Sequence, residues 1–453
     1  MEANTQNGLT PWWPTLFGAP EETSFRQLLS DPLGRSNRVS SAIPTAVDDE
    51  TRKASRVAFA ELTGESRGNA RPPTRTFCEK VDALSSLLSA LSGTPIDGFA
   101  LLAERSLRGN GVRRNGPISC GGATRLLPCL DGTIAISLSR ATDIDSLPAF
   151  LAALGTVPAT AETAGATEDE TWRVLERAIA RGPARLWVEQ AVLLDMAVGE
   201  LRETPTPTVE EPAVRTLTGP RQSDPPMGTG AARREHAPPL VVDLSSLWAG
   251  PLCSRLLRQA GMRVIKVEDV NRTDGARVGS PEFFAALHRG KEFMQFDFHS
   301  GSGRRDLAEL LQRADVVIEG SRPRALASLG IDVEQLLRGS GPGLWTSITG
   351  HGRTGRWANR AAFGDDAAVA GGLVHPEGPD TWFFGDAVAD PLTGMVAAAA
   401  TLMAWKDSKQ PTSSNRAGRS STLLDVAMAR VAAAFSGRAP KLPGFPRVGC
   451  DDD

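Results

Sequence analysis

Residues 241–268 constrain the fold more than any other part of this chain, because they predict a strand, a helix and a second strand in close succession. An apolar run ends at Asp243, and a Gly250-Pro251 step opens a helix with proline at its first position. Gly261 ends that helix, and a second apolar run closes at Glu268. Such alternation builds open parallel sheets with flanking helices. The turn after the first strand has no G-x-G-x-x-G sequence, so the glycine cradle of a dinucleotide-binding fold is missing. We therefore expect a Rossmann-like unit that does not bind NAD.

Composition limits the partners and the location of the protein. The 453 residues carry a net charge of −3, which argues against a nucleic-acid partner. The first residues are polar and lack the segments of a secretion signal, and the longest apolar stretch, 396–405, is too short to span a bilayer. The five scattered cysteines have no metal-ligand spacing. These observations predict a cytoplasmic protein with no membrane segment and no metal site.

Changes in composition and in hydrophobic pattern along the chain predict an α/β fold in five parts. They are a polar, partly disordered N-terminal extension (1–70), a small α+β domain (71–203), a linker rich in proline, glycine and charge (204–237), a large Rossmann-like domain (238–437) with an open, mainly parallel sheet, and a loose tail (438–453). Periodicity predicts helices over 77–91, 96–107, 148–154, 172–180, 184–195, 303–314, 391–405 and 427–435. It predicts strands over 134–138, 293–298, 316–318, 344–348 and 422–426.

Short motifs in a fixed order follow the opening unit. They are VVDLSSLWAGP, GMRVIKVE, LHRGKEFMQFDF, ADVVIEGSRP, LGID and SITGHGRTG. Together they resemble the large domain of the class III CoA-transferases (CaiB/BaiF type), a family that includes formyl-CoA transferase and the α-methylacyl-CoA racemases. The resemblance spans residues 240–437. It implies an acyl-CoA:carboxylate CoA-transferase that works as a homodimer, with a coenzyme A thioester as substrate and no permanently bound cofactor.

A fainter resemblance lies in the N-terminal half. Residues 118–122 (ISCGG), followed by Arg125 and an Asp131-Gly132 turn into a strand, resemble the glycine-rich loop of the family's small domain. In the family these elements follow the large domain, whereas here they precede it. The chain is therefore similar to a permuted family member, or to the end of one copy fused to the start of another.

The resemblance implies a carboxylate nucleophile for the transfer. In the family an aspartate four residues before a glycine, at the start of a helix, has this role, and Asp390 before Gly394 matches it. An aspartate at a helix start is also favoured by the backbone N–H groups and the helix dipole, which keep it ionised. Asp386, which follows Gly385, is the rival candidate. The same Asp-Pro step is also an ordinary helix cap.

A second acidic pair, Asp365-Asp366, follows Gly364 at the place where racemases of the family carry Gly-His-Asp. A racemase needs two acid–base groups at the α-carbon, and no histidine stands there, which favours transfer over racemisation. Asp365 is a further candidate catalytic residue, although two acids also make an ordinary helix start. An α-methylacyl-CoA racemase-like enzyme and a non-catalytic CoA-binding subunit remain the alternatives.

Binding of CoA needs cations for its phosphates and an apolar slot for adenine. Basic residues at two strand boundaries are the candidates: His288, Arg289, Lys291, Arg322 and Arg324. By resemblance, three further residues fall where the family contacts the nucleotide or pantetheine: Phe296, Gly320 and Ser321. Trp248 stands where formyl-CoA transferase has a glutamine near the substrate, which implies a less polar acceptor acid. Each basic residue alone also fits a solvated surface charge.

Overall fold

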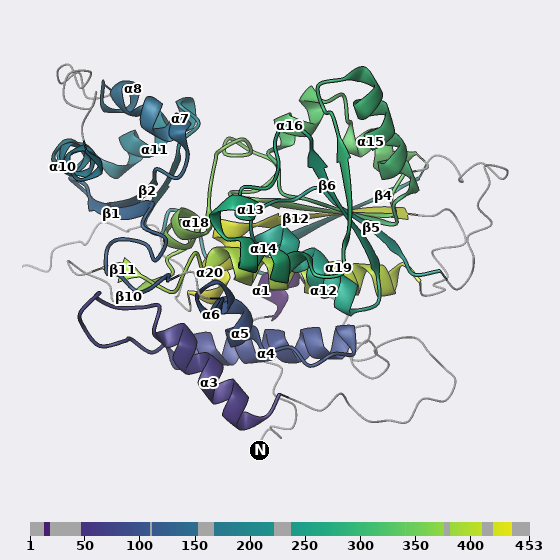
Figure 1. Cartoon of the computed structure of the whole chain (residues 1–453), viewed down its shortest axis with the longest axis horizontal. Coiled ribbons are helices and arrows are strands. Elements are labelled where there is room, and N and C mark those ends of the chain that lie inside the picture. The colour runs from purple at the N-terminus through teal and green to yellow at the C-terminus, as the bar shows by residue number, and fades with distance from the viewer. Residues whose placement is uncertain are drawn as a thin grey trace, which may run out of the picture.

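A seven-stranded sheet forms the centre of the computed structural model of this chain, in the order β4-β12-β9-β8-β5-β6-β7 (Figure 1). The structure describes residues 13–18, 47–108, 111–152, 167–221, 237–339, 341–375, 381–409 and 420–436. The strands are β4 (Val214–Pro220), β5 (Leu240–Asp243), β6 (Arg263–Asp269), β7 (Glu292–Phe296), β8 (Val316–Glu319), β9 (Leu344–Thr349) and β12 (Ser420–Ala427). Every neighbouring pair is parallel except β12 with β4. The predicted open, mainly parallel α/β sheet is confirmed.

The strand order reverses between β5 and β8, because the chain builds the sheet outward from β5 in both directions. Open α/β sheets bind ligands outside the carboxyl ends of their strands at such a reversal. Here the residues that leave those ends are Leu244 after β5 and Gly320 after β8. The loops that follow β5 and β8 are therefore the expected place for a bound ligand.

Helices cover both faces of the sheet (Figure 1). Neighbouring residues of β5 face opposite ways, so Val241 packs into the core beneath one face and Val242 into the core beneath the other. The first core takes up α12 (Ala249–Gln259), α14 (Pro281–His288), α19 (Ala389–Asp407) and α20 (Met428–Phe435). The second takes up α15 (Gly301–Arg313), α16 (Pro323–Ser328) and α17 (Val333–Arg338). The short α13 (Ala276–Gly279) precedes α14.

The N-terminal helices pack on the large sheet's own core rather than on the small sheet. They are α1 (Trp13–Phe17), α3 (Asp49–Ala60), α4 (Arg75–Ser92), α5 (Gly98–Leu102) and α6 (Glu104–Leu107). Phe59 and Phe77 are buried against Phe384 of the large domain, with ring centroids 5.3 and 4.8 Å away. The expectation that 71–203 forms one small unit therefore differs from the structure, which assigns 75–107 to the large core.

A separate three-stranded antiparallel sheet, β1-β2-β3, occupies the small part of the molecule at the upper left of Figure 1. Its elements are β1 (Thr124–Pro128), β2 (Thr133–Ser137), α7 (Ala141–Asp145), α8 (Leu147–Leu151), α10 (Glu168–Ile179), α11 (Ala184–Leu193) and β3 (Ala197–Glu200). The unit has its own core around Phe150 and Trp187. On the side of the large domain, β3 contacts α18 (Gly364–Ala370). The pair β10 (Val374–His375) and β11 (Trp382–Phe383) follows α18.

The segment expected to be a linker contains part of the main sheet. Residues 214–220 of 204–237 form β4, the edge strand, which pairs with β12 over seven residues. Within 1–70, the structure describes α1 and α3, and the tail 438–453 lies outside the described residues. Among the described residues, no helix is both long and apolar enough to cross a membrane.

Candidate active site

The first turns of α18 and α19 meet at Gly364. A β-carbon on Gly364 would lie 2.5 Å from the carbonyl oxygen of Ala387 and 2.5 Å from Oδ2 of Asp390. Gly394, one turn along α19, lies equally close to α12, since its β-carbon would sit 2.6 Å from the Ala249 carbonyl oxygen. Small residues at these two points let three helices approach closely. The approach fixes Asp390, in the first turn of α19, beside the start of α18.

The turn before α19 brings in the other two predicted carboxylates. The N–H of Ala387 donates to Oδ1 of Asp365 at 3.0 Å. Gly385 and Ala387 both have positive φ, 74° and 44°, which is strained for alanine. The structure thus brings the three candidate carboxylates together; we call Asp365, Asp386 and Asp390 the acidic group. Asp386 is buried, whereas Asp365 and Asp390 are only partly buried.

Arg105 of α6 holds Asp386, a contact that sequence reasoning missed. Its Nε donates to Oδ2 of Asp386 at 2.6 Å, and its Nη2 donates to Oδ1 in a second, shorter bond. The guanidinium carbon also lies 5.5 Å from the centre of the Trp248 ring, at the start of α12. Trp248 is therefore beside the acidic group.

The glycine loop of 118–122 lies against the same group. A β-carbon on Gly121 would sit 3.4 Å from Nη2 of Arg105. Sγ of Cys120 donates to the Gly385 carbonyl oxygen at 3.4 Å, and the Ser119 side chain hydrogen-bonds Asp365. Residues 118–122, which resemble the family's glycine-rich loop, thus contact Arg105, Asp365 and the turn before α19.

Burial, together with the charge of neighbouring carboxylates, raises the pKa values of Asp365, Asp366 and Asp390. Burial raises the pKa of Asp390 to about 7; Arg105 acts against this shift, while Asp365 and Asp386 add to it. Burial, followed by the charge of Asp386, raises the pKa of Asp365 to about 6, again against Arg105. Burial raises the pKa of Asp366 to about 8. Two carboxylates that titrate near neutral pH are unusual outside functional sites.

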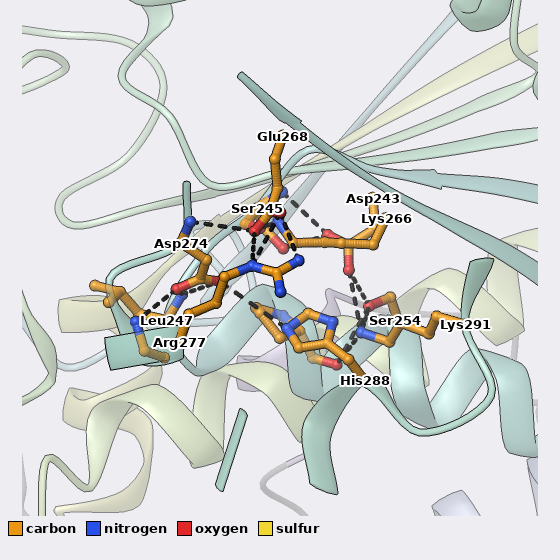
Figure 2. A network of polar contacts seen from close by, with 12 residues as sticks. Asp243, Ser245, Leu247, Ser254, Lys266, Glu268, Asp274, Arg277, His288 and Lys291 are labelled. Atoms are coloured by element: carbon orange, nitrogen blue, oxygen red, sulfur yellow. Dashed lines mark hydrogen bonds and ion pairs between the residues drawn. The ribbon is translucent and has the colours of Figure 1, made fainter. Parts of the chain in front are cut away.

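A buried polar network supports the loop between β5 and α12 (Figure 2). Lys291 donates to Asp243 (3.2 Å), the Pro251 carbonyl (2.9 Å) and Ser254 (2.7 Å). Lys266 donates to the Ser245 carbonyl oxygen. Nearby charged groups, Lys291 first, outweigh burial and hold the pKa of Asp243 well below its usual range.

A second part of that network holds Leu247, which has a φ of 70°. Asp274 accepts from the Leu247 N–H at 3.1 Å, and Glu268 accepts from Arg277 at 2.7 Å. These bonds keep the loop in a strained shape directly before Trp248. The network therefore positions the tryptophan that stacks on Arg105.

The predicted CoA-binding residues divide into two groups. His288 and Lys291 are buried, and Lys291 has no exposed side-chain surface. Burial lowers the pKa of His288 to about 3, so it is neutral at pH 7. Neither presents a charge to solvent, so for these two the expectation of a phosphate contact is corrected. The physical reason is that Asp243 needs a buried cation.

The remaining predicted residues lie at both edges of the sheet: Arg289 precedes β7 at its amino end, whereas the others end β7 or follow β8 at the carboxyl ends. Arg289 is exposed after α14, Phe296 ends β7, and Gly320 and Ser321 follow β8. Arg322 and Arg324 form ion pairs with Asp195 of the small sheet's unit. These two arginines are therefore engaged across the two parts of the chain. Among the described residues, no group of histidine, cysteine and carboxylate side chains could hold a metal ion.

A family profile described as CoA-transferase family III matches residues 239–440. We call these residues the family III domain, after the profile that they match. The family III domain contains Trp248, Asp365, Asp386 and Asp390, whereas Arg105 and the glycine loop lie outside it.

Two named relatives of the family III domain are transferases. An acetyl-CoA:oxalate CoA-transferase of Acetobacter aceti is 30% identical over 166 residues, which cover 34% of this chain and 43% of the relative. A succinyl-CoA:glutarate CoA-transferase of Mus musculus is 31% identical, over 36% of this chain and 39% of the relative. A solved CAIB/BAIF family protein from Brucella suis is 29% identical with a TM-score of 0.39, covering 44% of this chain and 54% of that protein. The chain thus spans less than half the length of the two named relatives.

Proposed function

We propose that this protein transfers coenzyme A from an acyl-CoA to a carboxylic acid, with Asp390 as the nucleophile. The observation that carries the proposal is the position of Asp390, a partly buried aspartate in the first turn of α19, close to Asp365, Asp386 and Arg105. Asp386 is less suited to attack, because Arg105 engages both of its oxygens and its side chain is 1% exposed.

The transfer proceeds in steps that split one exchange into easier parts. The Asp390 carboxylate attacks the thioester carbonyl and releases CoA thiolate, which gives an aspartyl–acyl anhydride. The thiolate then attacks the aspartyl carbonyl, releases the donor carboxylate and leaves an aspartyl-CoA thioester. The acceptor carboxylate attacks that thioester to form a second anhydride. The released thiolate attacks its acyl carbonyl, so the new acyl-CoA leaves and Asp390 is restored.

The backbone around Asp390 suits this chemistry. The positive end of the α19 dipole favours the ionised carboxylate, and the Gly364 backbone hydrogen bond to Asp390 lowers its pKa in the same sense. N–H groups at a helix start also stabilise oxyanions that form as each carbonyl is attacked. The close approach at Gly364 keeps these donors beside the reacting carboxylate.

The CoA moiety would lie along the carboxyl ends of β7 and β8. Phe296 offers a partly buried ring there, and Gly320 and Ser321 offer a loop without bulky side chains. Arg289 offers an exposed cation at the other edge of the sheet, before β7. A homodimer in the cytoplasm completes the proposal. Light scattering of the purified protein tests the dimer.

The direct test is mass spectrometry of the intact protein after incubation with acyl-CoA thioesters and then hydroxylamine. The wild type should carry a hydroxamate at Asp390, and Asp390→Asn should carry none and lose exchange by on the order of a thousandfold or more. Asp407→Asn, the same change at the opposite end of α19, is the matched control and should behave as wild type. Exchange that survives in Asp390→Asn would overturn the proposal.

The same preparation separates the alternatives. Incorporation of deuterium at the α-carbon without exchange between acids would point to a racemase that uses Asp390 and Asp365 as acid and base. Binding of CoA with no turnover of any thioester would point to a non-catalytic CoA-binding subunit. Exchange between acids with no deuterium incorporation supports transfer.

A further inference from the structure

The charge balance around the carboxylates depends on a residue from outside the family III domain. Asp365, Asp386 and Asp390 come from 364–390, whereas Arg105, which bonds Asp386, comes from α6. The two partners are separated by 281 residues in sequence. Arg105 thus links the N-terminal helices to the turn at 385–388 before α19, which we call the catalytic turn.

Three other contacts hold the two segments in register. The N–H of Gly385 donates to Oγ1 of Thr63 at 2.9 Å, and the Phe384 ring packs edge-on against both Phe59 and Phe77. Arg105 itself rests against Trp248. The position of the guanidinium is therefore fixed from both sides, as an electrostatic role requires.

We propose that Arg105 is a positioning residue for the transfer: it fixes Asp386 and supplies a positive charge that favours the ionised form of Asp390, the form able to attack. The inference rests on the proposed role of Asp390 as nucleophile. It adds that the family III domain is not sufficient by itself, because the N-terminal helices contribute this charge.

Other groups that face Asp390 carry negative charge. Asp365 lies on α18 and Asp386 on the preceding turn, and both disfavour ionisation of Asp390. Arg105 is the cation that acts against them. An opposite charge within about 4–6 Å changes a carboxylate's pKa by roughly 1–3 units, so loss of Arg105 has a measurable consequence.

The test is the pH dependence of adduct formation at Asp390 in single-turnover experiments with an acyl-CoA. Arg105→Gln should move the midpoint of the rate profile upward by about one pH unit or more, so the rate near pH 6.5 falls about tenfold and recovers in part at high pH. Arg105→Lys keeps the charge and should keep the midpoint near that of wild type, at a lower rate because lysine lacks the paired N–H groups. Arg75→Gln, on the exposed start of α4, is the control for loss of an arginine.

A double substitution keeps the test valid if Arg105→Gln folds poorly. Asp386→Asn removes a negative charge and should lower the midpoint, and Arg105→Gln/Asp386→Asn should return it toward wild type, because the two charge changes cancel. A purely structural role predicts instead that the losses accumulate and the midpoint stays fixed. An unchanged midpoint in Arg105→Gln, with adducts still formed, overturns this inference alone. Absence of any adduct in wild type overturns the proposed nucleophile instead.

Discussion

Gly364 and Asp390 touch where the first turns of α18 and α19 meet, and the contact leaves no room for a side chain at position 364. Gly364→Ala would place its β-carbon 2.5 Å from both Oδ2 of Asp390 and the Ala387 carbonyl. One of these contacts is backbone, so the turn must shift, and we expect a destabilisation of about 1–3 kcal/mol together with a loss of transfer. Urea unfolding and exchange assays measure the two effects.

The matched control is Gly279→Ala in α13, where a β-carbon meets nothing within 4 Å. It should change neither stability nor exchange appreciably. If Gly364→Ala is as active as Gly279→Ala, the close approach between Gly364 and Asp390 is not needed for transfer.

Asp366 should make the protein less stable as the pH rises. The side chain is buried, its Oδ2 has no hydrogen-bond partner among the described residues, and its pKa is raised to about 8. Because folding raises this pKa above the usual 3.8, the folded chain binds more protons than the unfolded chain between about pH 4 and pH 8. The contribution to stability is therefore present at low pH and is lost as the pH rises through 8.

Asp366→Asn should remove that dependence, since asparagine resembles the protonated acid and still accepts from the Phe363 N–H. The urea midpoint of the variant should fall less than that of wild type between pH 5 and pH 8, with a difference of at most about 1.4 kcal/mol per pH unit. Parallel pH profiles for the two proteins would show that Asp366 does not titrate in this range.

Lys291 should matter for stability rather than for CoA. Lys291→Met would remove the cation that is hydrogen-bonded to the buried Asp243 and leave only Lys266 near it, and breaking such a pair typically costs about 3–5 kcal/mol. Arg289→Ala, two residues earlier on an exposed turn, should leave the unfolding midpoint unchanged and weaken the affinity for CoA. Thermal unfolding measures the effect of each substitution on stability, and calorimetric titration with CoA measures its effect on CoA affinity, so the roles of the two residues are distinguished. Stable folding of Lys291→Met with weakened CoA binding would restore the phosphate-binding interpretation.

The sequence predicted the large domain better than the surroundings of the site. Residues 241–268 showed β5, α12 and β6 because buried parallel strands leave apolar runs between helix signals. β4 was missed because only one of its seven residues is buried and four are exposed, so this proline-rich segment shows no apolar alternation. Arg105 was missed because its partner lies 281 residues away, a distance that no local pattern reports. Asp243 gave a signal for the burial of Lys291. An acid at the end of an apolar run is itself expected to be buried, and a buried carboxylate requires a buried partner.

Phe384 should couple the packing of the N-terminal helices to the catalytic turn, because its ring packs edge-on against Phe59 and Phe77 and the chain continues into Gly385 and Asp386. Phe384→Ala removes a buried ring and should cost about 3–5 kcal/mol in stability. The turn that it anchors should then loosen, so adduct formation at Asp390 slows in the protein that is still folded.

Phe150→Ala is the matched control, since it also removes a buried phenylalanine ring, from the separate core of the small sheet. Its stability should fall by a similar amount while the rate of adduct formation by the folded protein stays near that of wild type. Both variants are compared at a temperature at which circular dichroism shows each to be folded. Equal rates in the two variants would mean that the aromatic contact stabilises the chain without positioning Asp386. A slower rate confined to Phe384→Ala ties the N-terminal helices to the chemistry.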